Sequence, residues 1–239
     1  MSTDSTQLRP MEVGDIFGEA WKLYQENYVL FWSVTAIPLI IAAILNLFVL
    51  GGLLGYILSE VAIGAIVWAV SARYLGRAIE AMEPYSQIGA GQFVQLIISE
   101  LLATIVIVIG LVFLIVPGIY LAVKLALIPQ AIVIERQSIF GAWSRSWQLT
   151  DGHFWRTLGV GILIVLVAMG AAIVAGILAA ALGKLGGIAG PIINILAFPF
   201  VYGAATMLYY DLRHRKEGFG QVATAAPAGS PMGGTPEPV

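Results

Sequence analysis

The stretch that decides the fold is LLATIVIVIGLVFLIVPGIYLAVKLALIPQAIVIER, residues 101–136. It consists of two apolar runs separated by Pro117 and Gly118, and its first arginine is Arg136. A membrane-spanning helix takes about 17–25 mainly apolar residues, so each run is long enough to cross a bilayer. Because the Pro-Gly pair between the runs leaves only a tight connection, the stretch predicts an antiparallel helical hairpin in a membrane.

The rest of the chain follows the same pattern. Of its 239 residues, 59% are hydrophobic and only 11% are charged, and the mean hydropathy is +0.90. Soluble domains contain about 25% charged residues, so the composition excludes a soluble protein. We predict an all-α integral membrane fold with six transmembrane helices in three hairpins. The spans are expected at about 28–50, 53–75, 94–116, 118–134, 154–182 and 188–210.

Basic residues are distributed unevenly between the two sides of these spans. Ten of the twelve Lys and Arg residues lie at the two ends of the chain or in every second connection. These ten are Arg9, Lys22, Arg73, Arg77, Arg136, Arg145, Arg156, Arg213, Arg215 and Lys216. Connections that contain Lys and Arg stay in the cytoplasm during insertion. The pattern therefore predicts that both termini are cytoplasmic.

Amphipathic segments precede the three hairpins. They cover about 12–26, 86–93 and 138–149, and we expect interfacial helices there on the cytoplasmic side. Ser138 is expected to cap the third of them, and Asp151 to cap the fifth span. Pro129 is expected to kink the short fourth span. Residues 1–10 should be a flexible N-terminus, 11–216 a single membrane domain and 217–239 a disordered cytoplasmic tail, because the tail is rich in Pro, Gly, Ala, Ser and Thr.

Most tryptophans fall near the predicted cytoplasmic boundary. Trp21, Trp143, Trp147 and Trp155 lie there together with Arg145, which makes this set a candidate cytoplasmic interface. Tryptophan favours the headgroup level of a bilayer, so anchoring of the protein is the simpler interpretation. The alternative is a docking surface for anionic lipid headgroups, a protein partner or a second copy.

Four polar residues are predicted to lie in the outer third of the bilayer. Glu60 in the second span and Lys124 in the fourth should be at nearly the same depth, as should Asn46 and Asn194. A buried charge is costly when unpaired, so we expect a Glu60–Lys124 ion pair in one polar layer. It could serve transport, but a structural pair or a lysine that reaches back to the interface is favoured.

Small residues recur at every fourth position of the fifth span, at Ala168, Ala172, Gly176 and Ala180. Small residues let two helices approach closely in a membrane. We expect this strip to be an internal packing face, with a dimer interface as the alternative.

Direct signs of catalysis or cofactor binding are missing from the sequence. The chain has no cysteine, and His153 and His214 lack the spacing of metal ligands. No nucleotide-binding glycine signature or nucleophile elbow occurs. No basic stripe with interleaved aromatic residues indicates nucleic-acid binding. We therefore predict no catalytic, metal or cofactor-binding residues and no nucleic-acid partner.

Three segments resemble a known family: residues 117–135, 141–160 and 209–218, with residues 13–28 fitting as well. They are similar to the membrane domain of some glycerophosphoryl diester phosphodiesterases and of uncharacterised six-span proteins of the bacterial inner membrane. The phosphodiesterase chemistry of that family belongs to a separate soluble barrel, for which this chain has no room. The resemblance thus implies a non-enzymatic module of the bacterial cytoplasmic membrane, a scaffold, accessory or regulatory protein, with a small-solute or lipid transporter as the alternative.

Overall fold

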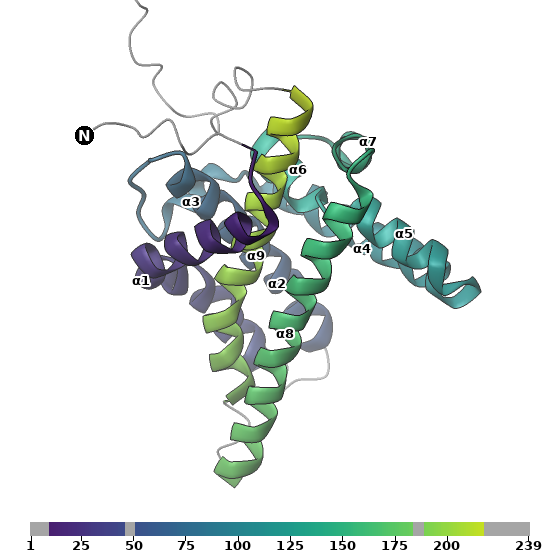
Figure 1. The fold of residues 1–239 in the computed structure, drawn as a ribbon. Coiled ribbons are helices and arrows are strands. Elements are labelled where there is room, and N and C mark those ends of the chain that lie inside the picture. Colours follow the sequence, from purple (N-terminus) through teal and green to yellow (C-terminus); the bar gives the residue numbers. More distant parts are fainter. Residues whose placement is uncertain (1–9, 46–50, 184–188, 218–239) are drawn as a thin grey trace, which may run out of the picture.

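Every element that the structure describes is a helix. The structure, a computed structural model, describes residues 10–45, 51–183 and 189–217 (Figure 1). The helices are α1 Val13–Leu45, α2 Gly51–Tyr74, α3 Glu83–Gln87, α4 Ala90–Phe113, α5 Ile115–Leu125, α6 Ile128–Glu135, α7 Ile139–Thr150, α8 Phe154–Leu182 and α9 Ala189–Glu217.

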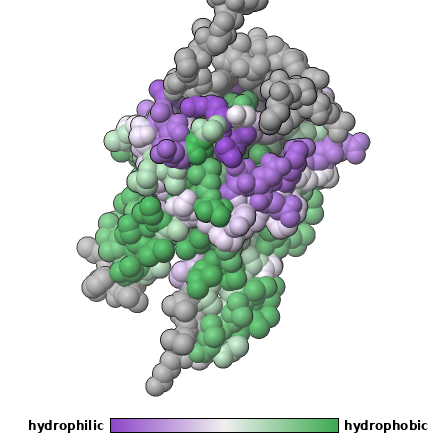
Figure 2. All heavy atoms as spheres, turned by 90° about the vertical axis from the view of Figure 1, so that its left-hand side faces the viewer, coloured by the Kyte–Doolittle hydropathy of each residue, from purple (hydrophilic) through white to green (hydrophobic). Residues whose placement is uncertain are grey.

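Within the described residues, six stretches of helix are long and apolar enough to cross a membrane, in agreement with the predicted number of spans. Five are single elements, and the fourth, from Ile115 to Glu135, consists of α5 and α6. Hydrophilic and hydrophobic residues lie on different parts of the surface. Figure 2 shows hydrophilic residues gathered over one end and a hydrophobic surface over the rest. We call the hydrophilic end, where α3, α6, α7 and the last turns of α9 gather, the charged end.

The first predicted interfacial helix and the first predicted span form one element, α1. A kink at Asn27, with φ −129° and ψ 20°, separates the two parts. The Asn27 side chain donates to the carbonyl of Leu23 at 3.0 Å and receives a hydrogen bond from Arg73 at the end of α2. These hydrogen bonds join the kink to α2. Because of the kink, the amphipathic part of α1 before Asn27 can run in a different direction from the part after it.

The fourth span is interrupted near its middle rather than kinked at its proline. Helix α5 ends at Leu125, and α6 starts at Ile128 with Pro129 in its first turn. Proline fits a first helical turn because it needs no N–H donor there. All residues from Ile128 to Ile134 are buried, so α6 lies within the protein, against α2, α4 and α7.

The hydrophobic core lies in the half of the molecule next to the charged end. Large fully buried side chains there include Phe31 of α1, Ile66 of α2, Ile132 of α6 and Tyr209 of α9. The α4–α5 pair leans away from α8 and α9 in Figure 1. At its tip, Phe113 is 80% exposed and Val116 78% exposed. Apolar residues exposed on this scale indicate contact with lipid or with another protein.

The α4–α5 pair is held together by a close backbone approach. A Cβ atom on Gly118 would lie 2.4 Å from Leu111 Cγ and 2.5 Å from the Leu111 backbone nitrogen. Only glycine leaves room for two helices at this separation. The tight connection expected at Pro117 and Gly118 thus has a packing reason, although Leu114, not the Pro-Gly pair, is the residue between the two helices.

Candidate functional site

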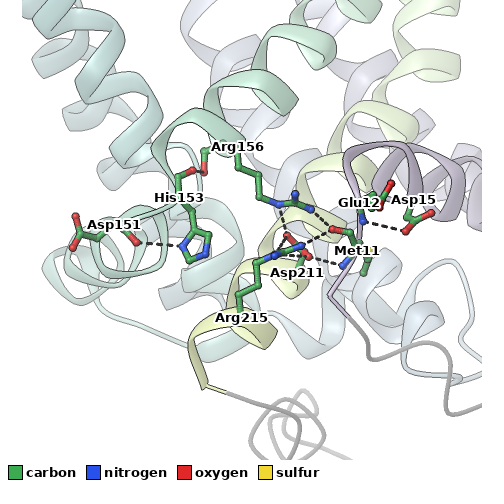
Figure 3. A network of polar contacts seen from close by, with 9 residues as sticks. Met11, Glu12, Asp15, Asp151, His153, Arg156, Asp211 and Arg215 are labelled. Atoms are coloured by element: carbon green, nitrogen blue, oxygen red, sulfur yellow. Dashed lines mark hydrogen bonds and ion pairs between the residues drawn. The ribbon is translucent and has the colours of Figure 1, made fainter.

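A buried carboxylate, Asp211 of α9, organises the first polar network of the charged end (Figure 3). Its side chain is 0% exposed. It accepts hydrogen bonds from Met11 N at 2.7 Å, Arg156 Nε at 2.7 Å and Arg215 Nε at 3.1 Å. Both arginines also donate to the Met11 carbonyl, so both polar backbone atoms of this residue are engaged. The network joins the start of the chain to α8 and to the last turns of α9.

A second network surrounds Glu135 at the end of α6. Arg145 of α7 donates to both of its carboxylate oxygens, at 2.7 and 2.8 Å. Arg213 of α9 lies 3.2 Å from it, and Tyr209 donates a hydrogen bond to it. Arg145 and Arg213 also pair with Glu217. Although burial opposes the charged form, the bonds to Glu135 and Glu217 raise the pKa of the Arg145 guanidinium above its ordinary value.

These two networks connect α6, α7, α8, α9 and the segment before α1. In each network, arginines pair with carboxylates. Bidentate and charge-assisted hydrogen bonds are stronger than neutral ones and fix geometry. Within the described residues, no group of three or more His, Asp or Glu side chains is placed to hold a metal ion. The arrangement holds the helices of the charged end in place.

The five predicted interface residues occupy three kinds of environment. Trp155 is 80% exposed, while Trp21 and Trp147 are about half-exposed. Trp143 is partly buried and donates its indole N–H to Ser99 Oγ at 2.8 Å, which ties α7 to α4. Arg145 is held by the carboxylates described above. Three of the five therefore face outward, and the other two pack or pair within the protein.

The expected Glu60–Lys124 ion pair is wrong. Lys124 Nζ lies 3.1 Å from Asp151 Oδ1, at the start of the loop between α7 and α8, and 5.2 Å from the centre of the Trp147 ring. The depth estimate failed because α5 ends one residue after Lys124, which brings this lysine to the charged end and not to the outer third. The alternative, a lysine that reaches back to the interface, stays a prediction.

The remaining members of the expected polar layer are not brought together with Lys124. Asn194 is exposed in the first part of α9, and Asn46 lies outside the described residues. Asp151 does not cap α8: His153 holds that position, without a side-chain cap. Lys124 instead lowers the pKa of the Asp151 carboxyl, first by its hydrogen bond and second by its charge. The expected cap at Ser138 is confirmed, since its hydroxyl accepts from Gly141 N at 3.3 Å.

Glu60 instead lies near a carboxylate that the sequence reasoning missed, Glu100 of α4. Glu60 is 5% exposed and lies close enough to act electrostatically on Glu100, and both acids act on Tyr202 of α9. Glu60 Oε2 and Glu100 Oε1 are buried and have no hydrogen-bond partner in the described part of the chain. The signal was available: Glu100 is the only charged residue in the 24 residues of α4.

An apolar hollow of about 490 Å³ separates α5 from α8. Its wall on α8 includes Leu158, Ile162 and Val165, and its wall on α5 includes Ile119 and Ala122. Sites for small molecules have volumes of about 300–1,000 Å³ but contain convergent polar groups that orient the ligand. This hollow is lined almost entirely by hydrocarbon, so it suits an apolar chain or helix and not a reactant.

Comparison with known proteins identifies sequences that are similar to this chain. A UPF0259 membrane protein of Photorhabdus laumondii subsp. laumondii is 32% identical over 110 residues, which cover 46% of this chain and 42% of that protein. The match thus spans less than half of that relative's length. No solved structure matches the chain. Together with the six apolar helices, this relative supports a membrane location. The resemblance to phosphodiesterase membrane domains stays a prediction.

Residues 35–213 match the family described as "Domain of unknown function (DUF7847)", and because this match covers well over half of the chain, the protein belongs to the DUF7847 family.

Proposed function

We propose that this protein is a non-enzymatic membrane scaffold that assembles with a second copy of itself through one face of α8. The observation that supports the proposal is the exposure of the small-residue strip. Ala168, Ala172, Gly176 and Ala180 are all exposed, so the expectation that they form an internal packing face is wrong. Only Thr157 and Val160 of α8 are buried.

The strip continues the wall of the apolar hollow. At 100° per residue, the strip lies on the same side of α8 as the hollow-lining residues Leu158, Ile162 and Val165. Because the α4–α5 pair leans away, no described helix covers the distal half of this face. A Cβ atom on Gly176 would have no neighbour within 4 Å. Another helix can therefore approach α8 closely here, in the way that small residues promote in membranes.

A second copy suits this face because the strip is complementary to itself. Symmetric dimers place the same patch of both subunits in contact, and they are the commonest oligomers. Packing of small residues would bury backbone against backbone in place of lipid. The charged end would remain outside this contact, with its networks holding the helices of each copy in place.

The proposed orientation puts the charged end in the cytoplasm of a bacterium. The ten basic residues support it through the positive-inside tendency. Trp21, Phe140 and Trp155 are exposed and would lie at the headgroup level, where anionic lipids would meet the remaining exposed basic side chains. A transporter remains the alternative function, but the ion pair expected to serve it is not formed.

Cysteine cross-linking tests the scaffold proposal directly, because the chain has no cysteine of its own. In native membranes treated with copper phenanthroline as the oxidant, Ala172→Cys and Gly176→Cys should form disulfide-linked dimers. Val174→Cys is the matched control, since Val174 is also exposed but points away from the strip. Absence of dimers at Ala172 and Gly176, or equal cross-linking at Val174, would contradict the proposal. In the same background, Ser86→Cys at the charged end should react with impermeant reagents only from the cytoplasmic side.

A further inference from the structure

Two acids inside the membrane-spanning region lack the partners that buried charges need. Glu60 of α2 is 5% exposed, and its Oε2 atom is buried without a hydrogen-bond partner among the described residues. Glu100 of α4 is half-buried, and its Oε1 atom is buried and equally unpartnered. The nearby Tyr56 hydroxyl is also buried without a hydrogen bond of good geometry, although it lies close enough to interact with the Glu60 carboxyl. The described salt bridges leave both acids without a cation.

The packing of α2 against α4 brings these groups to one place. A Cβ atom on Gly64 would lie 3.0 Å from Phe93 Cε1 and 3.2 Å from Leu96 Cδ2, so the two helices touch closely there. Glu60 is one turn before Gly64 on α2, and Glu100 is one turn after Leu96 on α4. Helix α2 ends and α4 begins at the charged end, so the two helices run antiparallel and both steps lead away from that end. The acids therefore lie on the same side of the Gly64 contact, each one turn away from it.

Among the described residues, the groups that interact with the two acids carry hydroxyls and no positive charge. Tyr56 lies one turn before Glu60 on the same face of α2, and Tyr202 approaches from α9. Tyr56 acts on Glu60, Glu60 acts on Glu100, and both acids act on Tyr202. Lys124, the cation expected near Glu60, is held by Asp151 at the charged end.

We propose that Glu60 and Glu100 form a proton-binding carboxyl pair between α2 and α4. Two ionised carboxylates side by side in a low-dielectric region repel each other and lose hydration, which is prohibitively unfavourable. One bound proton leaves a single negative charge for the two groups, and the protonated carboxyl can donate a hydrogen bond to an oxygen that otherwise has none. Intramembrane acids of this kind commonly mark proton pathways. The pair goes beyond the proposed scaffold and does not depend on it.

Difference infrared spectroscopy of the purified full-length protein in lipid nanodiscs tests this inference. At neutral pH in sodium-free buffer, the wild type should show the C=O stretch of a protonated carboxylic acid, shifted in D₂O. Glu60→Gln or Glu100→Gln alone should shift or remove this band, and the double variant should lack it. The exposed Glu12→Gln is the matched control and should leave the band unchanged. A wild type without the band, or a double variant that retains it, overturns the proposal.

Two further measurements distinguish a bound proton from a bound metal cation and from a pair without either. Addition of sodium should leave the band in place, and a band that sodium abolishes would mean that the pair holds a metal cation instead.

Unfolding temperature gives a readout independent of the spectrum. Removal of the proton at alkaline pH leaves two buried negative charges, so the wild type should lose thermal stability as the pH rises and the double variant should lose less. Identical pH dependence of the two proteins would count against a bound proton. Cysteine cross-linking at α8 is unaffected by these variants, so failure of one proposal can be told from failure of the other.

Discussion

Substitution of Asp211 by Asn should destabilise the protein strongly, because this buried carboxylate pairs with both Arg156 and Arg215. The side chain is 0% exposed and accepts from Met11 N, Arg156 Nε and Arg215 Nε. Asn is the same size, but an amide group that donates replaces one of the carboxylate oxygens, and the negative charge is lost. Two guanidinium groups would then face each other without an anion.

The expected loss follows from the burial of the partners. Removing one member of a buried ion pair costs about 3–5 kcal/mol, since the other charge is left uncompensated. Arg156 and Arg215 are 19% and 28% exposed, so water can partly compensate them. We therefore expect a loss of about 3 kcal/mol in the free energy of unfolding, at the lower end of that range.

Denaturant titration of the purified protein in detergent micelles, followed by tryptophan fluorescence, measures this loss. Glu80→Gln controls for removal of an exposed acid and should have almost no effect. Arg215→Gln removes a partly exposed partner at i+4 and should cost no more than about 1 kcal/mol. A loss below about 1 kcal/mol for Asp211→Asn, or one no larger than that of Arg215→Gln, would refute the assigned role of the network.

Two other predictions concern the α4–α5 pair and the loop before α8. Gly118→Ala should lower the free energy of unfolding by about 1–3 kcal/mol, because the added methyl group would meet the Leu111 backbone. Gly91→Ala is the control and should cost nothing, because a Cβ atom there meets nothing within 4 Å. Equal losses for the two variants would be inconsistent with a tight contact at Gly118. The pKa of Asp151 is lowered by Lys124, so the pair persists above the ordinary Asp range and dissociates as the pH falls through the lowered pKa. Fluorescence of Trp147, which packs against Lys124, should report this acid transition, and Asp151→Asn should abolish it.

Local sequence patterns were sufficient for the all-helical class of the fold and for the number of apolar helices long enough to cross a membrane. Apolar runs of spanning length predicted six membrane-spanning helices, because a bilayer requires each crossing segment to satisfy its own backbone. The predicted break between residues 26 and 28 coincides with the kink at Asn27. The hydroxyl of Ser138 was recognisable as a cap from its position before an amphipathic helix. These features depend on neighbours within one or two turns.

The partners of the charged groups were decided only by the tertiary structure. The distribution of arginines predicted a side of the membrane, but not that Asp211 would collect Met11, Arg156 and Arg215 from three parts of the chain. Depth along an assumed straight span paired Lys124 with Glu60, whereas the end of α5 at Leu125 delivers Lys124 to Asp151. Ion pairs form between side chains that packing brings together, and packing directions follow from helix breaks and tilts.

The stretch 101–136 illustrates the division. Its hydropathy and its Pro-Gly pair were enough to predict two apolar helices joined by a tight turn, because length and chain reversal are local properties. Its second half, however, is α5 followed by the buried helix α6, and its first half continues a helix in which Glu100, just before the stretch, lies near Glu60 of α2. Burial of α6 and the proximity of the two acids depend on contacts with α2, which no periodicity within the stretch can encode.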